Sequence, residues 1–377
     1  MDERGESFPL GPDFEGKYKP IFENYGPRGI PLSEIRKQLL ENDDSIPRQL
    51  MRELIRKADS DRDGHLSYNE FIRLMQLRQR HLTRFQRLVR GAISTVVPRG
   101  AVNEYGEDVV DSYIDHYTCK PPPMFMILIS VIETIVFIIY AVILSKRGTP
   151  VTANTGCPTD SPLIFNPSRR YEAWRFLSYM LMHVGYLHLI FNLIFQLLLG
   201  IPLELVHKWW RMLIVYFLGV IAGSLCHTVF DQTTFLAGAS GGCYALIGAH
   251  FAIVIMNWKE MTHDWMDGVV KFLLSAPVRL GFWTILAGAD IGVAVYKRYF
   301  LEETTNVGYA AHLGGALAGL LIGIPVMKNI KKLKWERVVF WVSIVLYLLF
   351  VAFAVLWNIF YKGFPKTDWT KCCKADS

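Results

Sequence analysis

Seven stretches of the chain are long and apolar, and they alternate with more polar segments. Their approximate bounds are residues 124–144, 176–200, 212–230, 237–257, 277–296, 308–327 and 338–360. Because about 20 helical residues cross the hydrocarbon core of a bilayer, each stretch predicts a membrane-spanning helix. The fifth stretch, which contains Asp290 and several glycines, has the weakest apolar pattern of the set.

The composition supports a membrane protein with a soluble head. Of the 377 residues, 51% are apolar and 20% are charged, whereas charged residues make up about 25% of soluble chains. The charges gather in the first third of the chain, whose charged start lacks the pattern of a cleavable signal peptide. The net charge of +6 gives no case for a nucleic-acid partner, and the six cysteines form neither a CxxC motif nor a disulfide framework.

Residues 59–70 match the loop of a calcium-binding EF-hand. Gly64 stands at the sixth position, where the loop turns sharply. The expected ligands, in order, are Asp59, Asp61, Asp63, the backbone carbonyl of His65, Ser67 through a water molecule, and a bidentate Glu70. Hard oxygen ligands at this spacing select Ca²⁺, so calcium is the expected cofactor. The alternative interpretation is an acidic turn between two helices.

A second hand is expected to accompany this loop. Leu66, at the eighth loop position, should pair with a sister loop, and residues 17–44 look like a degenerate hand without a run of carboxylates. Farther along, residues 77–93 place apolar residues and arginines on different faces of a helix. Such a basic amphipathic helix lies on an anionic leaflet, serves as a calmodulin-type target, or continues the head into solvent.

Polar residues inside spans are costly and by default indicate function. His188 and Asn192 lie four residues apart in the second span, and thus on one helix face. Ser240 and His312 lie at the starts of the fourth and sixth spans. Because even-numbered spans cross the membrane in the same direction, their N-terminal ends meet at one side. The order of the spans alone therefore predicts that these four side chains lie at one depth in the membrane.

This set of residues suits nucleophilic catalysis. A serine hydroxyl becomes a nucleophile when a base accepts its proton, and histidine has the appropriate pKa range. Gly238 and Gly241 flank Ser240 and leave its hydroxyl exposed at a helix N-terminus, which favours an oxyanion. Small residues repeat every four positions on the fourth and sixth spans, so these two helices are expected to approach closely.

At these residues the chain resembles the rhomboid family of intramembrane serine proteases, over about residues 120–330. The family's Gly-x-Ser-Gly motif stands here at residues 238–241, its Ala-His-x-x-Gly motif at residues 311–315, and its His-x-x-x-Asn motif at residues 188–192. The Trp-Arg pair that helps to hold the family's first loop appears as residues 174–175, and Gly200 and Glu204 also fit the family pattern.

The resemblance implies a role for each matched residue. Ser240 would be the nucleophile and His312 its base, while His188 and Asn192 would stabilise the oxyanion. Tyr244, one turn after Ser240, matches the tyrosine that packs on the catalytic histidine. The family works with a Ser–His dyad that needs no cofactor, and no acidic third member is evident in this sequence.

The expected fold is therefore all-α and polytopic, with a soluble EF-hand head. Residues 1–76 would form the EF-hand domain with its degenerate first hand, and residues 77–121 a basic helix and linker. Residues 122–330 would form a rhomboid-like six-helix core. Residues 331–377 would add a seventh transmembrane helix and a tail, as in secretase-type animal members of the family.

The expected activity is that of a serine endopeptidase. Its substrates would be single-span membrane proteins, such as growth-factor precursors, cleaved in or near the transmembrane segment, with Ca²⁺ as a modulator. The protein would lie in the lipid bilayer of the plasma membrane or the Golgi and secretory pathway. Its N-terminus would be cytosolic, and its active site would face the lumen or the outside.

Two other classes of protein fit part of the pattern. A non-catalytic membrane adaptor would bind single-span clients and control their trafficking, but it would not need Ser240 and His312. A seven-span receptor or ion carrier would suit the number of spans, yet it gives no reason for the Ser240 motif. Asp290 and Glu133 could mark an ion path, although packing or interface roles are favoured.

Overall fold

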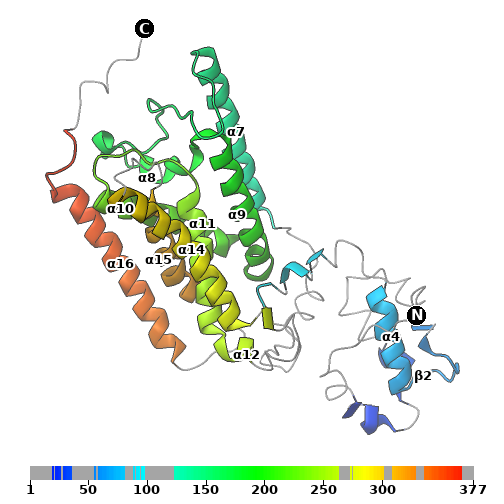
Figure 1. Cartoon of the computed structure of the whole chain (residues 1–377). Helices are drawn as coiled ribbons and strands as arrows, with labels where there is room; N and C mark the ends of the chain where they lie inside the picture. The colour runs from blue at the N-terminus through cyan, green and yellow to red at the C-terminus, as the bar shows by residue number, and fades with distance from the viewer. Residues whose placement is uncertain are drawn as a thin grey trace. The chain divides into compact units, whose positions relative to one another are not determined.

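The computed structural model describes residues 19–20, 22–26, 29–35, 55–56, 58–80, 88–89, 91–93, 95–97, 123–262, 272–273, 275–300, 308–327 and 335–366. The chain forms two compact units, residues 1–122 and 123–377 (Figure 1). Much of the basic helix predicted over residues 77–93 lies outside the described residues, as does the tail beyond residue 366.

The first unit is built around the pairing of two loops. Strand β1 (Ile30–Pro31) pairs in antiparallel fashion with strand β2 (His65–Leu66), and Ile30 lies opposite Leu66. The sister loop predicted for Leu66 is therefore present. A Cβ atom at Gly29 would lie 2.0 Å from the Leu66 carbonyl oxygen, so only glycine allows the loops to approach this closely.

Apolar side chains around this pairing form one core. Helix α4 (Tyr68–Arg80) follows β2 and contributes two of them. The buried members are Phe22, Ile35, Ile55, Ala58, Leu66, Phe71 and Leu74. Full burial of each large apolar side chain contributes about 1.5–3 kcal/mol. The acidic loop between residues 59 and 70 is therefore held on a packed base.

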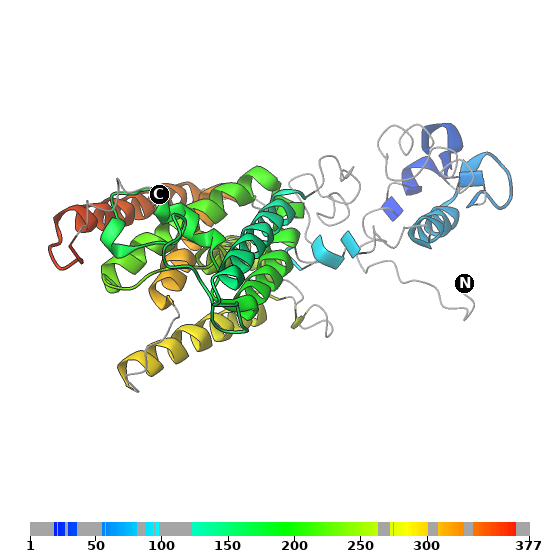
Figure 2. The same cartoon turned by 90° about the horizontal axis from the view of Figure 1, so that it is seen from above.

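The second unit is a bundle of helices (Figures 1 and 2). Its long helices are α7 (Phe125–Lys146), α9 (Gly185–His207), α10 (Trp209–Phe230), α11 (Ser240–Met256), α14 (Ala276–Tyr299), α15 (Tyr309–Val326) and α16 (Glu336–Phe360). Short helices are η1 (Pro167–Arg169), α8 (Arg175–Ser178), η2 (Tyr179–Leu181) and α12 (Trp258–Thr262). Among the described helices, α7, α9, α10, α15 and α16 are long and apolar enough to cross a membrane, and α11 is a shorter apolar helix.

Helices α11 and α15 lie in the middle of this bundle. Helices α7 and α9 run together on one flank, and α16 lies on the opposite flank (Figures 1 and 2). In the most apolar windows of α7 and α16, 22% and 17% of the residues are buried, whereas most residues of α11 are buried. The outer helices therefore turn apolar faces to lipid, while their neighbours shield α11 from it.

Helix α9 confirms the second predicted span, but it begins at Gly185 and not at residue 176. Residues 175–181 instead form α8 and η2, and Met182 is extended and buried. Gly185 has a φ angle of +77°, and a Cβ atom there would lie 2.4 Å from the Ala153 carbonyl oxygen. The loop before α9 is apolar because it packs into the bundle, and hydropathy alone does not distinguish such a loop from a span.

A buried arginine holds the loop between α7 and α9. The Nη1 group of Arg175 donates hydrogen bonds to the carbonyl oxygens of Ser161 (2.8 Å) and Ile164 (2.7 Å), and Arg175 also pairs with Glu172. The Trp174 indole donates to another carbonyl of the same loop. These contacts match the role that the resemblance implies for residues 174–175.

Helix α9 also anchors the start of α7. The carboxylate of Glu204 accepts hydrogen bonds from the backbone N–H groups of Phe125 (2.8 Å) and Met126 (3.0 Å). A helix N-terminus has free N–H groups and favours negative charge. Gly200 leaves room for this contact, because a Cβ atom there would lie 2.3 Å from the Met126 sulfur.

A buried polar cluster joins α7, α9 and α10. Glu133, Gln196 and Tyr216 are fully buried. Gln196 donates from Nε2 to Ser130 Oγ (2.8 Å) and to Glu133 (3.3 Å). The Tyr216 oxygen lies 2.5 Å from Gln196 Oε1 and 3.0 Å from Glu133 Oε1. A phenol has one proton, so both contacts are satisfied when Glu133 is protonated and donates to the phenol oxygen.

Substitutions of Glu133 test this proton assignment. Glu133→Gln keeps one donor and one acceptor, so we expect little change in the free energy of unfolding. Glu133→Ala leaves buried polar groups without partners, at about 1–3 kcal/mol for each, and opens a cavity. Unfolding of the purified protein in detergent micelles, followed by its helical signal, measures both variants. Equal destabilisation by the two substitutions would contradict a protonated Glu133.

Candidate active site and metal loop

Ser240 is the first residue of α11. The N–H groups of Gly242 and Cys243 both donate to the Ala239 carbonyl oxygen, at 2.9 and 3.1 Å. The N–H groups of Ser240 and Gly241 therefore precede the first hydrogen-bonded turn of the helix. The segment presents one half-buried hydroxyl and two backbone donors at a helix N-terminus, where the helix dipole favours negative charge.

Glycines bring α15 into backbone contact with α11. A Cβ atom at Gly315 would lie 2.2 Å from the Gly241 carbonyl oxygen, and one at Gly319 would lie 2.0 Å from the Ala245 carbonyl oxygen. The close approach predicted from the small residues of the fourth and sixth spans is therefore confirmed. It places the first turns of the two helices beside each other.

His312 lies in the first turn of α15 and is held by a stacked ring. The Tyr244 ring, one turn after Ser240, lies parallel to the imidazole, with ring centroids 4.3 Å apart and an interplanar angle of 10°. This is the contact that the resemblance implies for Tyr244. Among the described residues, no hydrogen bond joins the Ser240 hydroxyl to His312, and catalytic hydrogen bonds commonly tighten only when substrate binds.

An acidic residue that the sequence did not make evident contacts His312. Asp290 Oδ2 lies 2.9 Å from His312 Nδ1 and accepts a hydrogen bond from the Tyr244 hydroxyl. Asp290 belongs to α14, so three helices meet at the imidazole. The sequence carries one signal for this contact, because a carboxylate inside a predicted span indicates function by default.

His188 lies against the glycine turn before Ser240. A Cβ atom at Gly238 would lie 2.7 Å from His188 Nε2, and Gly238 has a φ angle of +118°, so this position requires glycine on both grounds. The Val184 N–H donates to His188 Nδ1 at 3.3 Å. The proton of a neutral imidazole is then on Nε2. His188 therefore directs an N–H donor toward the chain that leads into α11.

Asn192 is buried one turn after His188. Its amide nitrogen donates to the His188 carbonyl oxygen at 2.7 Å, and its Oδ1 lies 3.6 Å from Cys243 Sγ. Among the described residues, Asn192 thus contacts α11 through Cys243. One amide hydrogen is used within α9, and the second is available to another acceptor.

Comparisons with known proteins identify the family of this chain. A family model described as the Rhomboid domain matches residues 170–329. Rhomboid-related protein 3 of Homo sapiens is 32% identical, over 95% of this chain and 91% of that protein. The chain belongs to the rhomboid family. Rhomboid-related protein 2 of Mus musculus is 42% identical, over 67% of this rhomboid and 80% of that protein.

One relative of this rhomboid is described as inactive. Inactive rhomboid-related protein 2 of Caenorhabditis elegans is 37% identical, over 65% of this chain and 66% of that protein. Family membership therefore establishes an integral, multi-pass membrane protein in a lipid bilayer. The question of activity rests on the residues that this rhomboid itself places at the site.

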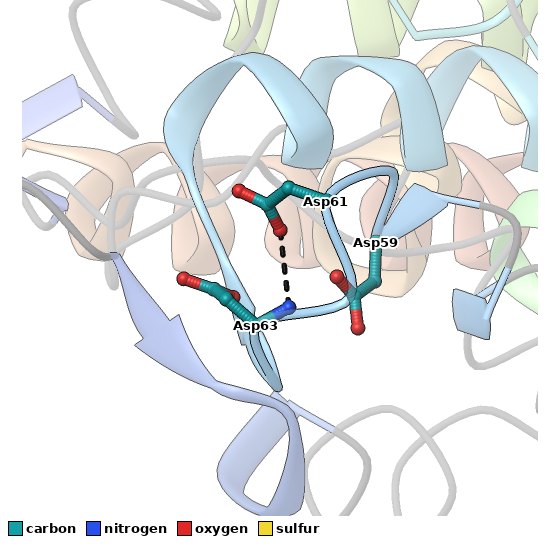
Figure 3. Close-up of side chains that lie close together, drawn as sticks. All are labelled: Asp59, Asp61 and Asp63. Atoms are coloured by element: carbon teal, nitrogen blue, oxygen red, sulfur yellow. Dashed lines mark hydrogen bonds between the residues drawn. The ribbon is translucent and has the colours of Figure 1, made fainter.

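The head of this rhomboid gathers three carboxylates in one loop. Oxygen atoms of Asp59, Asp61 and Asp63 lie within 4.8 Å of one another (Figure 3). Asp59 Oδ1 is buried, and no described residue forms a hydrogen bond with it. A buried carboxylate oxygen without a partner is costly, and a cation would satisfy it. The oxygen-only donor set fits Ca²⁺.

Glu70 closes the same loop. Its carboxylate accepts hydrogen bonds from the Ser60 N–H (2.7 Å) and from the N–H (3.1 Å) and hydroxyl (2.8 Å) of Ser67, while the His65 N–H donates to Asp63 Oδ1 (2.7 Å). Burial raises the pKa of Glu70, but the hydrogen bonds outweigh burial and lower this pKa below its ordinary value. The resulting stabilisation is present above the unfolded pKa and is lost as the pH falls through the folded pKa.

A substitution at the α11–α15 contact tests the packing of the site. Gly315→Ala places a methyl group against the backbone of Gly241 and forces the helices apart. Overpacking of this kind costs about 1–3 kcal/mol. Gly288→Ala is the matched control, because a Cβ atom at Gly288 would meet no atom within 4 Å among the described residues. The free energies of unfolding in detergent micelles compare the two, and equal values would contradict the close contact.

Proposed function

We propose that this rhomboid is an intramembrane serine endopeptidase. The observation that carries the proposal is the position of His312, whose imidazole stacks on Tyr244, one turn after Ser240 at the start of α11. A serine at a helix N-terminus and an oriented imidazole beside the same turn are the two components that acyl transfer requires. No cofactor is needed for this chemistry.

The reaction would proceed through an acyl-enzyme. Ser240 Oγ bonds to the carbonyl carbon of the scissile peptide while its proton passes to His312 Nε2. The substrate oxygen becomes an oxyanion, to which the first N–H groups of α11 and His188 Nε2–H donate. The C–N bond then breaks, and His312 gives the proton to the leaving amine. Water, deprotonated by the same imidazole, hydrolyses the ester and restores the Ser240 hydroxyl.

The length of α11 supports cleavage within the bilayer. Its 17 residues extend over roughly 25 Å at about 1.5 Å per residue, which is less than the ~30 Å of a hydrocarbon core. With its C-terminal end at one surface, the helix leaves Ser240 below the other. The favoured substrate is therefore a single-span membrane protein whose helix unwinds locally, because an intact helix keeps its carbonyl groups in its own hydrogen bonds.

The charge pattern favours a cytosolic head. Lysines and an arginine cluster between residues 328 and 337, between the sixth and seventh predicted spans, and basic residues are enriched in cytoplasmic loops. Helix α15 runs from His312 toward this cluster. The site would then open toward the lumen or the outside, in the plasma membrane or the secretory pathway.

Release of a reporter ectodomain tests the activity. Co-expressed with a single-span reporter, the wild type should release the ectodomain. Ser240→Ala and His312→Ala should reduce release by about 10²-fold or more, because each removes a group that takes part in the bond-forming step. Ser343→Ala removes a buried hydroxyl of α16 and should behave as wild type. Equal release by the wild type and both site variants would refute the proposal.

The second candidate is a non-catalytic adaptor that binds single-span clients and controls their trafficking. The relative described as inactive is the observation in its favour. The presence of Ser240 and His312 in neighbouring helix turns favours catalysis. Covalent labelling of the wild type by a serine-directed fluorophosphonate, lost in Ser240→Ala, would exclude the adaptor.

We further propose that the head binds Ca²⁺ and that this ion modulates the membrane unit. The unpartnered Asp59 oxygen beside two other carboxylates supports the proposal. The ion would be held by Asp59, Asp61, Asp63, the His65 carbonyl, Ser67 through water, and Glu70. Its role would be regulatory, because the chemistry proposed at Ser240 draws on side chains and backbone alone.

Calorimetric titration of the full-length protein with Ca²⁺ tests the site in the head. The wild type should bind one ion, and Glu70→Gln should bind it roughly 10-fold more weakly or worse, since it loses a charged bidentate ligand. Glu23→Gln, at an exposed position of the same unit, is the matched control. Unchanged affinity in Glu70→Gln would contradict the site, and reporter release with and without Ca²⁺ measures the modulation.

A further inference from the structure

We propose that Asp290, on α14, is a positioning residue that orients the imidazole of His312 in the proposed Ser240–His312 dyad. The inference rests on the proposed function. Asp290 Oδ2 lies 2.9 Å from His312 Nδ1, and the Tyr244 hydroxyl donates to the same oxygen. Tyr244 also stacks on the imidazole, so each pair among Asp290, His312 and Tyr244 is in contact.

Proton positions at Asp290 follow from the types of donor and acceptor. An ionised carboxylate only accepts hydrogen bonds, so its contact with His312 requires a proton on Nδ1. The neutral imidazole then has its lone pair on Nε2, the atom that must accept the Ser240 proton. Asp290 therefore selects the tautomer that the proposed reaction needs.

Asp290 also places negative charge where positive charge develops. When His312 accepts the Ser240 proton, the ring becomes an imidazolium ion, and the carboxylate 2.9 Å from Nδ1 attracts it. This attraction is stronger in the low dielectric of a helix bundle than in water. Tyr244 holds both partners before the reaction begins, so little reorganisation is required.

The competing interpretation is a structural tie between α14 and its neighbours. The side chain of Asp290 is 47% exposed, and placing a charged group beside apolar helices costs more than placing a neutral one. An asparagine oxygen would accept the same two hydrogen bonds without that cost. A structural tie therefore needs no charge at residue 290, whereas stabilisation of an imidazolium ion does.

Steady-state cleavage of a single-span reporter by the purified full-length protein in liposomes isolates the effect of this charge. Asp290→Asn should lower kcat by about 10²-fold or more with KM changed by less than about two-fold. Asp290→Glu keeps the charge and should recover part of that loss. Glu133→Gln changes a buried acid of the bundle outside the candidate site and should cleave as wild type. Rates are expressed per folded molecule, with the folded fraction taken from thermal unfolding.

Three results would overturn the inference. A wild-type kcat in Asp290→Asn would show that the negative charge at residue 290 does not contribute to cleavage. Equal losses of kcat in Asp290→Asn and Asp290→Glu would show that a negative charge at residue 290 is not what supports cleavage. Failure of Asp290→Asn to fold, when Glu133→Gln folds normally, would assign Asp290 to a structural tie.

The contact between Asp290 and His312 can be tested even if the protein has no protease activity. If the wild type releases no more product than Ser240→Ala, the protease proposal fails, and cleavage no longer reports on Asp290. Nitrogen-15 NMR of histidine-labelled protein then tests the contact directly, with the His312 signals assigned by their loss in His312→Ala. The wild type should carry the proton on Nδ1 and Asp290→Ala should lose that preference. A proton on Nε2 in the wild type would overturn the inference.

Discussion

The backbone contact between α11 and α15 is the constraint on which the rest of the bundle depends. Lipid surrounds helices with apolar chains, so helices in a membrane associate mainly through van der Waals packing, and small residues strengthen it by allowing close approach. Gly315 and Gly319 provide that approach here. The contact also fixes the longitudinal register of the two helices. A slip of one helical turn, about 5.4 Å, would carry His312 away from the Tyr244 ring on which it stacks.

The acids of the bundle show how the remaining helices are arranged around this pair. Glu204 on α9 accepts from the first N–H groups of α7, and Glu133 on α7 meets side chains of α9 and α10. Each acid joins helices whose outer faces are apolar, and an isolated carboxyl group there would be expensive. Asp290 differs from both because it is half-exposed and because its partner is an imidazole at the candidate site. Its position is better explained by the charge it brings to His312 than by helix packing.

The order of the spans and the spacing of the acidic loop predict part of the fold and of the candidate site. Alternation of spans is enough to place Ser240 and His312 on the same side, and the eighth position of the acidic loop is enough to predict a strand partner for Leu66. Asp290 could not be placed in this way, because its contact with His312 depends on the rotation of α14 about its own axis. The start of α9 at Gly185 was missed for a related reason. The preceding loop is buried, so its apolar residues extend the hydrophobic pattern without extending the helix.

Two histidines in the same site are assigned opposite hydrogen-bonding roles by their neighbours. His188 Nδ1 accepts from the Val184 N–H, which leaves Nε2–H as a donor beside Gly238. His312 Nδ1 faces the Asp290 carboxylate, which leaves Nε2 as an acceptor. An oxyanion needs a donor and a serine hydroxyl needs an acceptor, so identical side chains serve both needs only when a second contact fixes each tautomer. A backbone amide suffices for His188, because the proposed reaction transfers no proton to that ring. In the proposed reaction His312 passes through a charged state, and the carboxylate of Asp290 is placed to stabilise it.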